Sequence, residues 1–193
     1  MKSFISKITP IEWLLDAELF YTGARCLLSN NILAPGIFLS CRTIEKYLKT
    51  FISIRTQHIP MTHDLQRLLT NVKEKKFLTS CKKNIEDNIN YFNLIQNNVS
   101  YVDAPEYTKK LPFPYGYGKC DINKLDEIIF NFEKALWEIE TIKGYSFSIT
   151  NIATIKEVLN TEKLPSRTVV WFNKEWLLKD NLYFKQNIRR QRS

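Results

Sequence analysis

The chain has 193 residues, enough for one well-cored domain with an appendage. Apolar residues make up 44% of it and charged residues 25%, a balance that argues against both a disordered chain and a membrane protein. No stretch comes near the roughly 18 uninterrupted apolar residues of a membrane span, and the first residues lack a secretory signal. We therefore expect a cytosolic protein that does not associate with membranes.

The net charge of +8 is concentrated at one end of the chain. Half of the excess lies in residues 181–193, which hold no acid and four basic residues: Lys185, Arg189, Arg190 and Arg192. Such a tail is either a solubilising end or an arm that contacts phosphates.

Neither a disulfide nor a metal site is indicated. The four cysteines (Cys26, Cys41, Cys81 and Cys120) are far apart and form no C-x-x-C pair, so we expect buried, reduced thiols. The only histidines, His58 and His63, lie close to Asp64 but lack the helical H-x-x-x-H spacing of a zinc site. We predict neither a metal nor a cofactor.

The first expected helix runs from Pro10 to about Asn30. Thr9 is placed to cap it, proline suits its first position, and Glu12 completes a capping box. Gly23 indicates that a neighbouring helix approaches closely. The apolar seam of this helix is predicted to be Leu14, Ala17, Tyr21, Ala24 and Leu28.

A central helix is expected after a turn that contains Pro35 and Gly36. Its core face has the helical spacing of Ile37, Cys41, Ile44, Leu48 and Phe51. Arg42, Lys46 and Lys49 form a cationic stripe on the other side, where Glu45 is placed to pair with Lys49. The stripe is either a solvated helix face or a phosphate-binding surface.

A loop with Pro60 separates this helix from a third one, for which Thr62 is the expected cap. The third helix is predicted to bury Leu65, Leu68, Leu69 and Val72. His63 and Asp64, at its start, have two interpretations. In one, Asp64 complements the helix dipole and His63 bonds a neighbouring helix; in the other, His63 and Arg55 contact a phosphate.

A charged break at residues 73–76 is expected before a fourth helix from about Thr79 to Asn98. Its predicted buried edge is Leu78, Cys81, Ile85, Ile89, Phe92, Ile95 and Val99. The long loop 100–120 then carries Tyr107, Lys109 and Lys110, which would assist phosphate binding if the loop folded back. A fifth helix, capped by Asp121 and ending near Gly144, is predicted to bury Ile122, Leu125, Ile129, Phe132, Leu136 and Ile139.

About five amphipathic helices with short connections predict an all-α fold, an antiparallel up-and-down bundle. We assign residues 1–144 to this bundle. We expect residues 145–193 to form a small extension, α/β or helical, because residues 150–160 suit a short helix and residues 167–172 have strand-like composition.

Several segments together resemble the HEPN domain family over residues 8–143. The most specific are Glu45-Lys46 and Leu48-Lys49 on the central helix, and Thr62-His63-Asp64-Leu65 at the start of the third. Residues 107–112 are similar to a degraded form of the family's arginine-tyrosine-proline element. The resemblance implies a small all-α bundle.

The resemblance also implies one of two activities. Many HEPN proteins are metal-independent ribonucleases, often toxins or antiviral effectors, which use an Arg followed by four to six residues and a His at a dimer interface. Others lack that motif and bind nucleotides, or act as partners of small nucleotidyltransferases. In this sequence neither Arg55 and His58 nor Arg55 and His63 has the nuclease spacing.

We therefore expect a noncatalytic homodimer that binds a nucleotide, an RNA phosphate or a nucleotidyltransferase-type partner. The expected binding residues are Arg42, Lys46, Lys49, Arg55, His63, Asp64, Tyr107, Lys109 and Lys110. Two alternatives remain open: a metal-independent ribonuclease that uses Arg55 and His63, and a structural interaction protein that docks a partner through residues 145–193.

Overall fold

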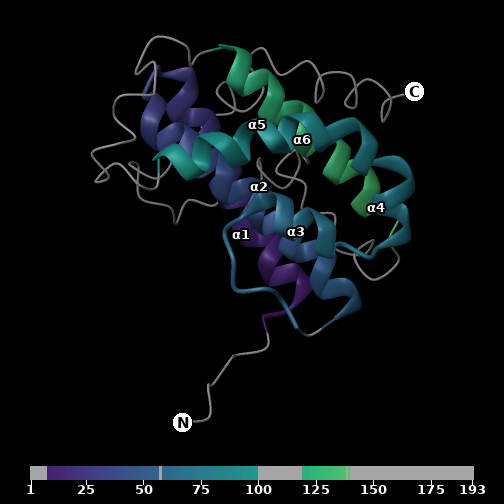
Figure 1. The fold of residues 1–193 in the computed structure, drawn as a ribbon. Coiled ribbons are helices and arrows are strands. Elements are labelled where there is room, and N and C mark those ends of the chain that lie inside the picture. The colour runs from purple at the N-terminus through teal and green to yellow at the C-terminus, as the bar shows by residue number, and fades with distance from the viewer. Residues whose placement is uncertain (1–7, 57, 100–118, 138, 140–193) are drawn as a thin grey trace, which may run out of the picture.

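The computed structural model describes residues 8–56, 58–99, 119–137 and 139. These residues contain six helices and no strand (Figure 1), which confirms the predicted all-α bundle. The helices are α1 (Pro10–Ser29), α2 (Leu33–Arg55), α3 (Leu65–Asn71), α4 (Lys75–Ser80), α5 (Lys82–Val99) and α6 (Lys119–Trp137). The predicted extension, residues 145–193, lies outside the described residues. No helix within the described ranges has the length and apolar character needed to cross a membrane.

The start of α1 has the predicted capping box. The side chain of Thr9 accepts a hydrogen bond from the backbone N–H of Glu12 at 3.2 Å. The Glu12 carboxylate accepts one from the backbone N–H of Thr9 at 2.6 Å. These bonds satisfy two groups that a helix start otherwise leaves without partners. The predicted apolar seam of α1 is buried along its whole length.

α1 and α2 run side by side as an antiparallel pair (Figure 1), and small residues let them approach closely. A Cβ atom added at Gly23 would lie 2.9 Å from the Leu39 side chain, so this glycine marks a close approach as predicted. The turn between the helices is tighter than expected, because α2 already begins at Leu33. Pro35 lies within its first turn, where proline is tolerated because those N–H groups have no intrahelical acceptor.

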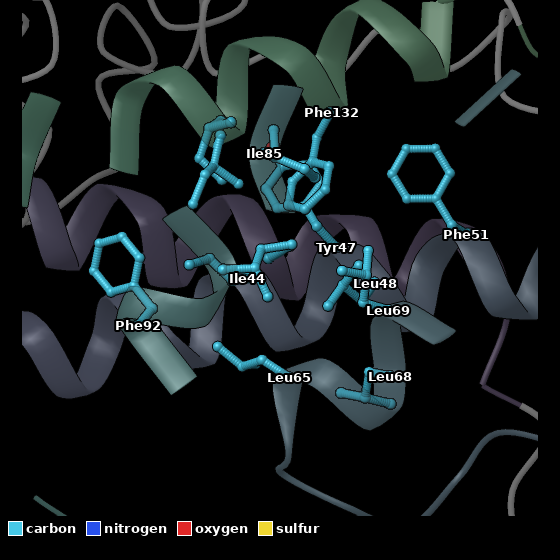
Figure 2. Packing of buried hydrophobic residues seen from close by; sticks show 14 of the residues in the cluster. Ile44, Tyr47, Leu48, Phe51, Leu65, Leu68, Leu69, Ile85, Phe92 and Phe132 are labelled. Atoms are coloured by element: carbon cyan, nitrogen blue, oxygen red, sulfur yellow. The ribbon is translucent and has the colours of Figure 1, made fainter. Parts of the chain in front are cut away.

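α2 is the centre of the bundle, since it packs against α1, α3, α5 and α6. All five predicted core residues of α2 are at most 1% exposed. Figure 2 shows Phe132 of α6 beside Tyr47 and leucines of α3 below α2; the Tyr47 and Phe132 rings stack with centroids 5.2 Å apart. Phe51 and Phe77 extend this aromatic core, with centroids 4.7 Å apart.

The predicted cap of α3 was wrong by two residues. Asp64 is the N-cap, and its carboxylate accepts a hydrogen bond from the Arg67 N–H at 3.1 Å. Thr62 instead accepts from the N–H of Asp64 at 3.1 Å and orders the approach to the helix. Leu65, whose N–H donates to the side chain of Asn93, begins the apolar face that contacts α2 and α5.

The boundaries of the later helices also differ from the predictions. α4 begins at Lys75, inside the expected break, because Phe77 is fully buried and draws this segment into the core. Leu78 was predicted to be buried, but it is 42% exposed. α6 begins at Lys119, so Asp121 lies inside the helix rather than capping it, and α6 ends at Trp137 rather than near Gly144. The predicted seam of α6 is confirmed as buried or partly buried.

Buried polar contacts tie α6 to α1 and α2. Tyr21 donates a hydrogen bond to one oxygen of Asp126 at 2.8 Å, and Arg25 pairs with the other oxygen. Tyr47 donates to the carboxylate of Glu133 at 2.5 Å. Because each of these groups has left water, loss of one partner strands a buried polar or charged group and costs stability.

Three cysteines are free thiols in this core, as predicted, whereas the side chain of Cys120 is outside the described part of the structure. The Sγ of Cys41 lies 3.5 Å from the carbonyl oxygen of Phe92 and donates to it. Burial raises the pKa of Cys41 to about 12 and raises that of Cys81 further. These thiols are therefore protonated and unreactive near neutral pH.

Candidate anion-binding site

A group of charges on α2 centres on Glu45, which is 2% exposed. Lys49 donates to its Oε1 at 2.7 Å, and Arg42 donates to its Oε2 at 2.7 Å. Both cations reach the carboxylate because residues three or four positions apart share a helix face. His63, from the loop before α3, places its Nδ1 3.1 Å from the same Oε2.

The environment keeps Glu45 ionised. Burial pushes its pKa up, but the hydrogen bonds and charges of Lys49 and Arg42 outweigh this effect and lower the pKa overall. Glu45 is thus a buried negative charge that holds cations in place.

Lys46 is held by α1 rather than by Glu45. Its Nζ donates to Asp16 at 2.8 Å and lies 4.5 Å from the centroid of the Trp13 ring and 5.8 Å from that of Phe20. Lys49 approaches the same Trp13 ring at 5.2 Å. These cation–π contacts restrict both lysines without neutralising them. We call Arg42, Lys46, Lys49 and His63, together with Glu45, the α2 cation cluster.

The members of the α2 cation cluster differ in their access to solvent. His63 is 64% exposed, Arg42 23% and Lys46 19%, whereas Lys49 is only 9% exposed. Arg42 also lies over the partly exposed Phe38 ring, 5.0 Å from its centroid. The first three side chains are therefore open to solvent, whereas Lys49 is buried against the Glu45 carboxylate.

Arg55 belongs to a different part of the surface. Its Nε donates to Glu74 at 2.5 Å, and half of the side chain is exposed. The axis of α2 rises roughly 15 Å between Glu45 and Arg55, whereas His63 lies beside Glu45. Within one chain, therefore, the structure brings His63 to Arg42 and holds Arg55 elsewhere.

The remaining residues of the predicted site fall into two groups. Asp64 is engaged in capping α3, so its carboxylate faces the helix N–H groups. Tyr107, Lys109 and Lys110 lie outside the described residues. Glu45 pairs with Lys49 as predicted, but Lys49 is buried, which corrects its expected place on an exposed stripe; Arg42 keeps a partly exposed position on α2.

Sequence reasoning missed the contribution of α1. Asp16 and Trp13 fix Lys46, yet they lie far from it in the chain and show no shared motif with it. Their only signal was the short connection to α2, which predicts an antiparallel neighbour but not its register. The contact between Arg42 and His63 was also missed.

Comparison with known proteins gives one result. The model of a protein family described as the HEPN domain matches residues 11–114, more than half of the chain. That range includes all of α1 but its first residue, α2 to α5, and every residue of the α2 cation cluster. No curated protein and no solved structure matches the chain.

Proposed function

Because the chain belongs to the HEPN domain family, we propose that it binds phosphate groups of a nucleotide or RNA, without catalysis, through the α2 cation cluster. One observation carries the proposal: Arg42, Lys46 and His63 reach solvent side by side on a framework that holds the cations in fixed positions. Arg42 offers the forked donors that suit phosphate oxygens, and Lys46 offers a point charge.

The charge balance favours an anion. Arg42, Lys46 and Lys49 face two carboxylates, Asp16 and Glu45, which leaves one positive charge uncompensated before His63 is counted. The carboxylates also reduce the entropy lost on binding, because they order the cations in advance.

Binding of a labelled short oligouridylate, followed by fluorescence anisotropy, tests the proposal. Arg42→Gln and Lys46→Gln should each weaken binding about fivefold, because a partly exposed charge contributes on the order of 1 kcal/mol. Lys83→Gln is the matched control, since it removes one exposed cation from α5. Equal losses in all three variants would mean that only the net charge matters and would refute the site.

The predicted homodimer is part of the same proposal. It is supported by two leucines one turn apart on α1, Leu15 and Leu19, which are 43% and 62% exposed. Leucines at that spacing share one helix face and would gain by burial against a second copy.

One observation favours a second candidate function, metal-independent RNA cleavage. Arg42 Nη1 lies 2.5 Å from His63 Nδ1, so a base and a cation that stabilises phosphate charge stand together. This pair replaces the Arg55 and His63 pair of the sequence-based hypothesis.

A further inference from the structure

A single nitrogen of His63 has two neighbours that make incompatible demands on it. Nδ1 lies 2.5 Å from Nη1 of Arg42 and 3.1 Å from Oε2 of Glu45. Arginine only donates, so a bond with Arg42 requires Nδ1 to be without hydrogen. A carboxylate only accepts, so a bond with Glu45 requires Nδ1 to carry one. The two bonds therefore cannot exist at the same time.

In the neutral ring with its hydrogen on Nε2, Nδ1 accepts from Arg42. The guanidinium group then donates both to His63 and to Glu45 and is held over the carboxylate. The exposed imidazole adds no charge to the α2 cation cluster in this state.

When His63 is protonated, both ring nitrogens carry hydrogen, and two donors cannot stay 2.5 Å apart. Nδ1 then donates to Glu45, and Arg42 must turn away from His63. The Arg42 side chain is already 23% exposed and packs on the Phe38 ring, so its guanidinium group can rotate into solvent. Protonation therefore adds one positive charge to the cluster and at the same time frees the Arg42 N–H donors that had bonded to His63.

The other charged groups near His63 do not cancel this change. Glu45 already accepts from Lys49 through its other oxygen, and Asp64, the next residue, caps α3. Lys46 and Asp16 pair with each other across α1 and α2.

We propose that protonation of His63 switches the α2 cation cluster to a state that binds phosphate more tightly. This inference rests on the proposed function and adds a regulator to the same site. Imidazole is suited to this role because it is the side chain that exchanges a proton nearest neutral pH.

The test measures the affinity of the full chain for a short oligouridylate without terminal phosphate, at about pH 6 and about pH 8. Phosphodiesters stay singly charged over this range, so the probe itself does not titrate. The wild type should bind roughly threefold to fivefold more tightly at the lower pH, because one partly solvated charge is added. His63→Asn should lose this difference.

His58→Asn is the matched control, because His58 is also exposed and its described hydrogen bond uses the backbone N–H, which the substitution keeps. It should retain the pH dependence of the wild type. Glu133 also titrates near neutrality, but it is present in all three proteins, so only the difference between them is attributed to His63.

The outcomes separate the inference from the proposed function. Binding by the wild type that does not change with pH, or a pH dependence retained by His63→Asn, would overturn the switch and leave phosphate binding intact. No binding at either pH would overturn both. A melting temperature within error of the wild type shows that each exposed-site variant is folded.

Discussion

Tyr47 of α2 and Glu133 of α6 share a hydrogen bond of 2.5 Å in the interior of the bundle. Burial raises the pKa of Glu133 to about 7, although the bond from Tyr47 acts in the opposite direction. The carboxyl group is therefore partly protonated near neutral pH. This contact joins the central helix to α6 and makes their packing sensitive to protons.

We expect stability to fall as the pH rises through this range. The folded chain holds the Glu133 proton more tightly than the unfolded chain, whose ordinary value is 4.5. The stabilisation from the protonated Glu133 carboxyl group is therefore fully present below about pH 4.5 and is lost as the pH rises to about 7, a change on the order of 3 kcal/mol. Thermal melts of wild type and Glu133→Gln across this range measure it. A variant that melts with the same pH dependence as the wild type would contradict this assignment.

Two glycines in the α1–α2 pair should respond differently to alanine. At Gly36 the new Cβ would meet the Leu28 side chain at 2.8 Å and the Leu28 backbone nitrogen at 3.2 Å, and backbone cannot move aside cheaply. At Gly23 it meets only the end of the Leu39 side chain. We expect Gly36→Ala to lower the free energy of unfolding by about 1–3 kcal/mol. Gly23→Ala should be near neutral, because the higher helix propensity of alanine offsets the cost of its close contact with Leu39. Urea unfolding of the two variants checks the order.

The sequence predicted those features that depend on residues close together in the chain. The capping box of Thr9 and Glu12 and the seam of α2 were correct, because helical spacing decides them. The predicted start of α4 was wrong. Its lysines indicated an exposed break in the sequence, whereas Phe77 is buried by tertiary contacts that the local pattern does not show. Distant contacts were beyond such reasoning.

The candidate site shows the same limit. Arg55 was paired with His63 because they are close in sequence, but the loop between them returns along α2 and brings His63 to Arg42. The angle at which a loop returns is set by its packing, for which the sequence has no periodic signal. The cations of α2 were found because they repeat at helical spacing.

Self-association can be tested on α1. If Leu15 and Leu19 lie in a homodimer interface, Leu19→Glu should shift the mass measured by light scattering from dimer to monomer, because a carboxylate would be buried there. Leu94→Glu, at an equally exposed position on α5, is the control and should leave the mass unchanged. A monomeric wild type would refute the homodimer outright.

RNA cleavage is decided by incubating the purified chain with RNA in the presence of a chelator. The proposed noncatalytic function predicts intact RNA. Cleavage that disappears in His63→Asn and Arg42→Lys but persists in His58→Asn would instead favour the second candidate, because Arg42 is in contact with His63. The variant Arg55→Gln shows whether Arg42 or Arg55 is the cation that cleavage requires. If that substitution alone abolished cleavage, Arg55 would be the required cation despite its pairing with Glu74, and a second subunit would have to bring it to His63.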